Sequence, residues 1–319
     1  MSPSQSRLAI GVDLGATTVK TGIVSRDGKL LYHSKMPSHG EQGPDAVVRQ
    51  IQASVADALK HTDGQSVAGI GIGAPGVVND RGVVQAPPNF ARWDSVPLRD
   101  EIQKLFNGLS IQVENDANTA GIAEAQFGAG RNFPNFLFVI WGTGVGGGII
   151  LNRQIYRGPT GGAGEIGHIC IDHNGPACNC GSRGCVEAYV GQRYLSKRTE
   201  EKLKSRPQSK ILKLVGGDVT KIEPYFIAQA AHEGDALAQE ILVEAGTLLG
   251  VALAGVMNTL DFRVSIIGGG ISAAGDVVMP AILESVKAHV LKPLKPDIRV
   301  IPAQLGNDAG ILGAAGLVL

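Results

Sequence analysis

Three cysteines, Cys178, Cys180 and Cys185, fall within eight residues, and nine residues separate them from His168 upstream. Three thiolates and one imidazole form a complete tetrahedral ligand set for zinc and leave no coordination position for water. Two glycines between Cys180 and Cys185 let the backbone turn tightly enough for the sulfurs to converge. The pattern predicts a structural zinc ion, which organises a loop rather than attacks a substrate.

Oxidised cysteines and a chance cluster are the alternatives to zinc. The spacing Cys-x-Cys-x4-Cys would strain a bridge between near neighbours, and three clustered cysteines leave one thiol over. The fourth cysteine, Cys170, lies in the apolar run 169–171, where we expect a small buried thiol. The spacing favours zinc without excluding the alternatives.

Acidic side chains stand beside the predicted zinc ligands, although a purely structural metal site needs none. Glu165 precedes His168 by three residues, and Glu187 follows Cys185 by two. Sugar binding requires several donors and acceptors that converge on hydroxyl groups. The candidates for this role are Asn115, Asp116, Glu165, His168 and Glu187. Trp93 could form a wall of such a pocket or belong to the core.

Asp116 lies where a predicted strand gives way to a predicted helix, with Asn115 and Asn118 beside it. A carboxylate fixed in this way can accept the proton of an attacking hydroxyl, and general-base catalysis of this kind is worth about 10²–10⁴ in rate. An aspartate before an apolar helix is equally typical of a helix N-cap. The position alone leaves both interpretations open.

Two glycine-rich turns that carry threonine could hold phosphate, because exposed backbone N–H groups form an anion-binding concavity. Their candidate residues are Gly15, Thr17 and Thr18 in the first turn, and Gly142, Thr143, Gly144 and Gly146 in the second. Neither turn ends in the Gly-Lys-Ser/Thr of a Walker loop. The second fits GxGxxG, but a strand is predicted after it, which removes the context of a dinucleotide-binding motif. Each turn taken singly could also be a tight structural hairpin.

Asp13 ends the first predicted strand and could orient a hydrated Mg²⁺ ion on nucleotide phosphates. An aspartate that caps a turn is the alternative. A third glycine turn, which contains Gly269 and Gly270, strengthens the case for a nucleotide site.

The elements that would position these residues alternate between strand and helix. In the first half we expect strands at 8–13, 19–24, 30–36, 67–73 and 111–113, and helices at 44–61, near 97–106 and directly after 118. In the second half we expect strands at 135–141, 149–151, 262–267 and 298–301, a glycine turn at 142–148, and helices at 236–260, after 275 and from about 307. This order predicts an α/β fold with two α/β domains and a cleft between them. The predicted domains are 1–118, completed by about 306–319, and 119–305.

Composition bounds the function further. The chain has 319 residues with 29 basic and 29 acidic side chains, so that its net charge of zero argues against a nucleic-acid partner. No purely apolar stretch approaches the ~20 residues that span a bilayer, and no secretory signal is expected, which points to the cytoplasm. The 44 glycines, nearly one residue in seven, lie in clusters that are typical of sharp turns and close approach to a ligand.

These motifs resemble the ROK family of bacterial sugar kinases and related repressors. The first phosphate motif of the family is similar to residues 13–17, and the second is similar to 142–148. Residues 165–168 followed by 178–187 match its most specific signature. The resemblance extends from about residue 8 to residues 307–313, and so covers nearly the whole chain.

The resemblance implies an actin-like ATPase (ribonuclease H-like) fold that binds ATP and Mg²⁺ at the hairpins, with adenosine near Gly269 and Gly270. It implies that Asp116 is the base that activates a hexose 6-hydroxyl. It further implies that Asn115, Glu165, His168 and Glu187 hold the sugar, and that His168, Cys178, Cys180 and Cys185 bind structural Zn²⁺. Members of the family are commonly homodimers.

Residues 114–118 and 73–76 are most similar to the glucokinases of the family, whereas N-acetylmannosamine kinases, fructokinases and N-acetylglucosamine kinases share most other motifs. Lys20 stands two residues after Thr18, where many relatives carry lysine directly after the first threonine, and we assign it no role. A repressor is disfavoured because twelve residues before Asp13 are too few for a helix-turn-helix. A non-catalytic binder is disfavoured by Asp116 and the two phosphate turns. We therefore expect a hexose kinase, with glucose as the preferred acceptor.

Overall fold

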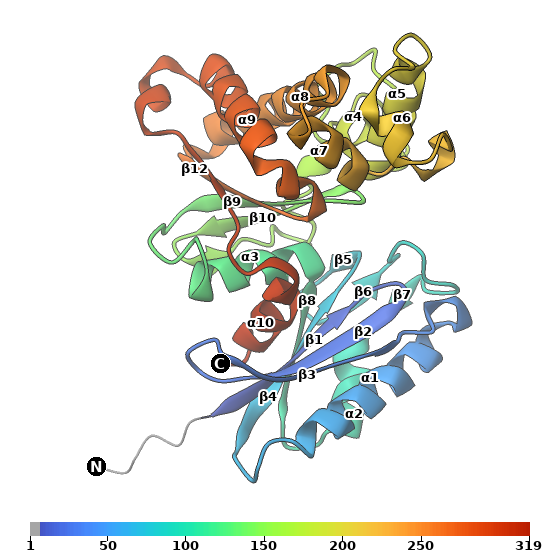
Figure 1. Ribbon diagram of the computed structural model, residues 1–319. Helices are drawn as coiled ribbons and strands as arrows, with labels where there is room; N and C mark the ends of the chain where they lie inside the picture. Colours follow the sequence, from blue (N-terminus) through green and yellow to red (C-terminus); the bar gives the residue numbers. More distant parts are fainter. Residues whose placement is uncertain (1–6) are drawn as a thin grey trace. The chain divides into compact units, whose positions relative to one another are not determined.

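The computed structural model describes residues 7–319, apart from the side chains of residues 272 and 273. The chain forms two compact units (Figure 1). The first contains the described residues up to Pro134, with Gly148–Gly164 and Leu305–Leu319, and the second contains Asn135–Gly147 and Glu165–Gln304. The first six residues of the predicted N-terminal domain lie outside the described residues. The functional boundary predicted at residue 118 stays a prediction.

A five-stranded sheet in the order β3-β2-β1-β4-β8 forms the centre of the first unit. Its strands are β1 (Leu8–Leu14), β2 (Thr18–Val24), β3 (Leu30–Pro37), β4 (Val67–Ala74) and β8 (Ser110–Asn115). The first three are antiparallel to one another, and β4 and β8 run parallel to β1. A small sheet of β5 (Val77–Val78), β6 (Val84–Gln85) and β7 (Ser95–Val96) follows β4.

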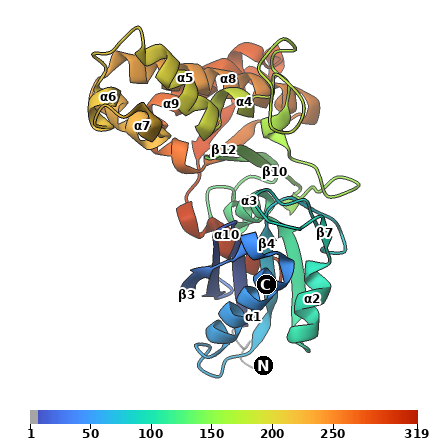
Figure 2. The same ribbon diagram turned by 90° about the vertical axis from the view of Figure 1, so that its right-hand side faces the viewer.

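Helices cover both faces of this sheet (Figures 1 and 2). One face packs against α1 (Pro44–Leu59) and α2 (Leu98–Leu105), and the other packs against α10 (Ala309–Gly316), which lies beside α3 (Asp116–Phe127). The short 3-10 helices of this unit are η1 (Gly40–Gln42) and η6 (Gly306–Asp308). The C-terminal segment thus returns to complete the first unit.

Two strand glycines explain how α10 lies so close to the sheet. A Cβ atom on Gly11 of β1 would lie 2.0 Å from the carbonyl oxygen of Ile311, and one on Gly71 of β4 would lie 1.7 Å from that of Ala314. Because any side chain at these positions would collide with helix backbone, only glycine fits. Part of the high glycine content therefore serves helix packing rather than ligand binding.

A second five-stranded sheet has the order β11-β10-β9-β12-β13. Its strands are β9 (Phe136–Trp141), β10 (Val145–Leu151), β11 (Gln154–Ile155), β12 (Val264–Gly268) and β13 (Arg299–Pro302). Strands β9 and β13 run parallel to β12, whereas β11 is antiparallel to β10. The connectivity repeats that of the first sheet: a pair of strands joined by a glycine turn, a returning third strand, and then parallel strands.

The remaining elements of the second unit are helical. They are α4 (Glu187–Val190), α5 (Gln192–Leu203), α6 (Lys210–Leu214), α7 (Pro224–His232), α8 (Ala236–Leu260) and α9 (Gly275–His289), with the 3-10 helices η2 (Ile166–His168), η3 (Val219–Lys221), η4 (Gly270–Ala274) and η5 (Lys292–Asp297). Figure 2 shows α8 and α9 packed side by side. Among the described residues, α8 alone is long and apolar enough to cross a membrane by length and composition, and 56% of its most apolar window is buried within the protein. Such burial is typical of a core helix.

The structure confirms the predicted succession of strands and helices, but several bounds differ. The helix expected directly after residue 118 already begins at Asp116. The second glycine turn was expected at 142–148, but β10 already begins at Val145, because pairing within the sheet draws the later glycines into the strand. The C-terminal helix begins at Ala309 after a turn of 3-10 helix, rather than at about 307. Trp93 is 4% exposed and donates its indole N–H to the carbonyl of Val84, which makes it a core residue rather than a pocket wall.

Candidate functional site

The first glycine turn is a tight hairpin between β1 and β2. The N–H of Gly15 donates to the carbonyl of Thr18 at 2.8 Å, and Thr17 is exposed at the tip. Ser38 fastens the turn from outside, because its N–H donates to the carbonyl of Thr17 and its hydroxyl donates to that of Ala16. The backbone of the turn is therefore held in place, as an anion-binding loop requires.

Asp13 lies at the mouth of this hairpin, and the register pairs it with Lys20 on β2. The Lys20 ammonium lies 2.9 Å from the carboxylate. On its other side Asp13 packs against Gly310 of α10, where a Cβ atom would lie 2.8 Å from the carboxylate carbon. Lys20, to which the sequence assigned no role, thus supplies a positive charge beside the predicted phosphate site. A hairpin closed by residues 15 and 18 places residues 13 and 20 opposite each other, so this pair could have been inferred.

Asn115, rather than Asp116, is the N-cap of α3. Asn115 has extended backbone angles, and its side-chain oxygen accepts the N–H of Asn118 at 3.0 Å. Asp116 is the first helical residue, and one of its carboxylate oxygens accepts the N–H of Ala117 at 2.8 Å. Because another residue already caps the helix, capping does not account for Asp116.

Glu114, which sequence reasoning missed, organises the residues around Asp116. Its Oε1 accepts the N–H of Asn115 and an amide proton of Asn118, both at 2.9 Å. Its Oε2 accepts from the guanidinium of Arg157 at 2.5 Å. The side chain of Glu114 is only 2% exposed, so this carboxylate is buried with its charge paired and its oxygens hydrogen-bonded. No local signal marks it, because Arg157 lies 43 residues away in the sequence.

The second glycine turn joins β9 to β10 through residues 142–144. The N–H of Gly142 donates to the carbonyl of Gly144 at 3.0 Å, and Thr143 is exposed. A strand follows, as the sequence predicted, so the context of a dinucleotide-binding motif is absent. The turn after β12 lies close by: Gly269 has φ 93°, and a Cβ there would lie 2.3 Å from the carbonyl oxygen of Trp141. The structure therefore brings the second and third predicted nucleotide-binding turns together.

Glu187 is the first residue of α4, and its side chain reaches the second turn. Its Oε2 accepts the N–H of Val145 at 2.9 Å. At the other end of α4, the indole N–H of Trp141 donates to the carbonyl of Val190 at 2.9 Å. The sequence placed Glu187 among sugar-binding candidates, but it gave no sign of this contact with the hairpin.

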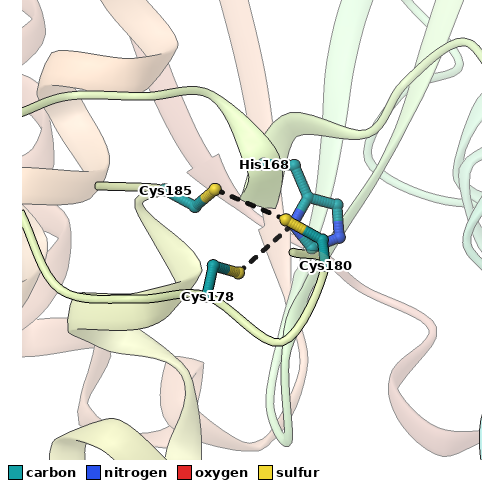
Figure 3. A group of neighbouring side chains, drawn as sticks. All are labelled: His168, Cys178, Cys180 and Cys185. Atoms are coloured by element: carbon teal, nitrogen blue, oxygen red, sulfur yellow. Dashed lines mark hydrogen bonds between the residues drawn. The ribbon is translucent and has the colours of Figure 1, made fainter. Parts of the chain in front are cut away.

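The four predicted zinc ligands converge at one point (Figure 3). His168 comes from η2 and the three cysteines come from the following loop, and one ligand atom from each lies within 4.8 Å of the others. The Nδ1 atom of His168 lies 3.7 Å from the Cys178 sulfur, and the sulfurs of Cys180 and Cys185 are also 3.7 Å apart. All four cysteines are free, since a disulfide would need about 2.0 Å between sulfurs.

The two separations of 3.7 Å are close to those in a tetrahedral zinc site. With Zn–S bonds of about 2.3 Å and a Zn–N bond of about 2.0 Å, a tetrahedron places two sulfurs about 3.8 Å apart and a sulfur and nitrogen about 3.5 Å apart. Burial, together with the neighbouring Cys180 and Cys178, raises the pKa of the Cys185 thiol to about 12. A cation at the centre would offset the cost of gathering three thiolates here.

Cys170 and Glu165 complete the surroundings of this cluster. Cys170 is exposed, contrary to the expectation of a buried thiol. Its segment does not form a buried strand, because the backbone of Cys170 makes only an isolated antiparallel β-bridge with that of Cys185. Glu165 is also exposed, and its carboxylate lies 3.9 Å from Nε2 of His168. His168 therefore directs Nδ1 to the cysteines and Nε2 towards the acidic residue.

A cavity of about 510 Å³ lies between α5 and the loop that carries the three clustered cysteines. Its lining includes Ala177 and Asn179 from the loop and Arg193 and Lys197 from α5. No predicted site residue is among the residues that line it.

The candidate residues thus form two groups, one in each unit. In the first unit the structure brings Gly15, Thr17 and Thr18 next to Asp13, and it joins Asn115 and Asp116 at the start of α3. In the second unit it brings together the hairpin of residues 142–146, the turn at Gly269 and Gly270, Glu187, and the cluster of His168 with three cysteines.

Three comparisons with known proteins agree with these motifs. A model of the ROK family matches residues 9–319. A glucokinase of Thermotoga maritima is 36% identical over 310 residues, which cover 97% of this chain and 96% of that protein. The crystal structure of a ROK family glucokinase from Streptomyces griseus in complex with glucose and AMPPNP is similar with a TM-score of 0.84 at 36% identity, covering 98% of this chain and 99% of that one. A xylose repressor of Bacillus spizizenii is 29% identical over 98% of this chain, which spans 77% of the repressor.

Proposed function

Because the chain belongs to the ROK family, we propose that it transfers the γ-phosphoryl group of ATP to the 6-hydroxyl of a hexose, with glucose as the preferred acceptor. The chain has the actin-like ATPase fold of its structural relatives. The observation that carries the proposal is the similarity, over nearly the whole chain, to a ROK family glucokinase crystallised with glucose and AMPPNP.

Asp116 acts as the general base in this proposal. Its carboxylate would take the proton from O6 as that oxygen attacks the γ-phosphorus, and ADP leaves with the electrons of the broken bond. Asn115 rather than Asp116 caps α3, and Glu114 accepts the backbone N–H of Asn115, directly before Asp116. The N-terminal end of a helix favours negative charge, which suits a base that must be ionised to act.

The two threonine-bearing hairpins and the turn at Gly269 and Gly270 would hold the nucleotide. Phosphoryl transfer asks mainly for positioning and charge stabilisation, which backbone N–H groups in fixed turns can supply. Asp13 would orient the water shell of Mg²⁺, which when bound neutralises charge on the phosphates. Lys20, which is paired with Asp13, contributes positive charge at the same place.

The sugar would be held by Asn115, Glu165, His168 and Glu187. Asn115 keeps part of its hydrogen-bonding capacity for a ligand, although its oxygen caps α3 and its amide donates to the carbonyl of Gly76. His168, Cys178, Cys180 and Cys185 would bind a structural Zn²⁺, which would fix the imidazole ring and the loop that leads to Glu187.

Free thiols suit the reducing cytoplasm, where we place the protein. We also expect a homodimer and no nucleic-acid or membrane partner.

The test is release of ADP in a coupled assay with Mg-ATP and zinc-replete protein. Glucose, N-acetylmannosamine, N-acetylglucosamine, mannose and fructose are compared at equal concentrations. We expect turnover with glucose to exceed that with the others, and to vanish in Asp116→Ala. A different preferred sugar would leave the chemistry intact but overturn the assignment of glucose. No turnover with any of these sugars would overturn the kinase proposal in favour of a sugar sensor or binding protein.

A further inference from the structure

Glu187 lies between two of the proposed binding regions of the second unit. It follows the zinc ligand Cys185 by two residues, and its Oε2 accepts the N–H of Val145 at 2.9 Å. Val145 is the first residue of β10, directly after the predicted phosphate turn. The carboxylate therefore holds the hairpin at the point where the turn ends.

The segment that follows Glu187 is fastened to the same hairpin at two more places. The N–H of Gln192 donates to the carbonyls of Gly142 and Thr143, each at 3.1 Å. Gly144 of the hairpin also lies against the carboxylate of Glu187, since a Cβ atom on that glycine would lie 2.4 Å from Oε2. The turn therefore has little freedom to move without α4.

The second oxygen of the carboxylate is left for another partner. Oε1 of Glu187 has no hydrogen bond to any residue in the described part of the chain. A carboxylate offers about four acceptor positions, so one oxygen can hold the backbone while the other accepts a hydroxyl. Once a ligand excludes water, an acceptor oxygen without a hydrogen-bond donor raises the free energy of the complex.

We propose that Glu187 is a positioning residue that couples the two substrates: Oε2 holds the phosphate hairpin while Oε1 accepts a sugar hydroxyl. The inference rests on the proposed function, because it takes the hairpin as a nucleotide site and Glu187 as a sugar ligand. A sugar that fixes the carboxylate also fixes the hairpin, so hexose binding tightens nucleotide binding. By linkage, nucleotide must tighten hexose binding by the same factor.

The experiment measures the affinity of Mg-AMPPNP by isothermal titration calorimetry, without sugar and with saturating glucose. Glu187→Ala removes the acceptor, and we expect its sugar-free affinity to fall by about tenfold, the scale of one hydrogen bond to a charged group. Glu187→Gln keeps an acceptor oxygen for Val145, so we expect its sugar-free affinity to remain within about threefold of the unsubstituted chain. Glucose should tighten AMPPNP binding in the unsubstituted chain and not in Glu187→Ala.

Glu165→Ala is the matched control, because Glu165 is the other glutamate assigned to the sugar and it lies beside His168 rather than on the hairpin. We expect it to weaken glucose binding while it keeps both the sugar-free AMPPNP affinity and the tightening at saturating glucose. Zinc content is measured for every variant to establish that the loop has folded.

Two results would overturn the inference while leaving the kinase proposal in place. One is a sugar-free AMPPNP affinity in Glu187→Ala equal to that of the unsubstituted chain. The other is an equal loss in Glu165→Ala, which would make the effect a general consequence of damage near the sugar. If Glu187→Ala does not fold, Glu187→Gln decides, and a tenfold loss there would refute the role of the acceptor oxygen. An unsubstituted chain that does not bind AMPPNP at all would overturn the proposed function itself.

Discussion

Replacing Cys180 with serine removes one of the four atoms that would hold zinc and changes little else, since Cys180 is exposed and serine has nearly the same shape. An ion at the centre of a tetrahedron with edges of 3.7 Å lies about 2.3 Å from each corner, which is the length of a Zn–S bond. Two of the ligand pairs have this 3.7 Å separation, Cys180 with Cys185 and Cys178 with His168, and the four ligand atoms all lie within 4.8 Å of one another. The hydroxyl of serine is a poor replacement for a thiolate. We expect the unsubstituted chain to hold one zinc ion and Cys180→Ser to lose it.

X-ray absorption at the zinc edge measures this directly. We expect three sulfurs at about 2.3 Å and one nitrogen at about 2.0 Å in the unsubstituted chain. Structural zinc in small peptides contributes about 10–16 kcal/mol to folding of its site, so we expect the loop of Cys180→Ser to become susceptible to proteolysis. Glucose binding should be lost together with the metal, because the metal would fix the ring of His168 and the loop that leads to Glu187.

Cys170→Ser is the control, since Cys170 is an exposed cysteine outside the four-residue cluster. It should keep both zinc and glucose binding. Glucose affinity that survives in Cys180→Ser without metal would refute the link between zinc and the sugar site. A zinc shell with fewer than three sulfurs would refute the ligand assignment.

Three further substitutions test the proposed base, the buried carboxylate next to it and the N-cap of α8. Asp116→Asn should lower kcat by about 10²–10⁴, the usual worth of a general base, while glucose and AMPPNP dissociation constants, measured by calorimetry, change only a few-fold. Glu114→Ala leaves the Asn118 amide and the Arg157 guanidinium without their acceptor, and it should lower the free energy of unfolding in urea by about 2–3 kcal/mol, since Arg157 is partly exposed; an unchanged midpoint would contradict the role given to this network. Burial alone raises the pKa of Asp235, the N-cap of α8, but hydrogen bonds from the backbone of Ala238 and Lys210 outweigh it and hold that pKa below its usual value. The stabilisation of the folded protein by the Asp235 carboxylate is therefore complete above the unfolded pKa of about 3.9, and it is lost as the pH falls through the lower folded pKa. In denaturant unfolding, Asp235→Ala should lower the free energy of unfolding by about 1–2 kcal/mol at pH 7 and by progressively less below pH 4. A loss of stability that grows on acidification would contradict this role.

The convergence of His168 with three cysteines and the order of the strands were accessible from sequence because their signals are local. Cysteines two to five residues apart and a histidine shortly before them can converge only within one loop. The bounds of α8 were predicted correctly as 236–260, because its apolar positions recur over seven turns and an aspartate precedes it. Hairpins joined by short glycine turns likewise fix their own pairing.

The wrong predictions came from places where tertiary structure overrides local preference. Cys170 lies between two isoleucines and was expected to be buried, but it is exposed. Its backbone makes only an isolated β-bridge with that of Cys185, and its segment is not part of a buried strand. Glycines 146–148 resemble a turn, yet they belong to β10. The sequence left open whether Asp116 caps α3, because the cap depends on the backbone angles of Asn115, which no periodicity reveals.

Two contacts that organise the candidate site had no sequence signal at all. Glu114 meets Arg157 across 43 residues, and Glu187 meets the N–H of Val145 across 42. Such pairs follow from how strands and loops pack, and a single sequence carries no record of that packing. The candidate residues could therefore be named in advance, but the network that holds them could not.

The most direct test of the proposed reaction is to identify the molecule that receives the phosphoryl group of ATP. The unsubstituted chain is incubated with Mg-ATP and either glucose or 6-deoxyglucose, and the products are identified by phosphorus NMR and mass spectrometry. We expect glucose 6-phosphate in an amount equal to the ADP released, and no sugar phosphate from 6-deoxyglucose. ADP without a sugar phosphate, or a phosphate on any other hydroxyl, would contradict the proposed reaction.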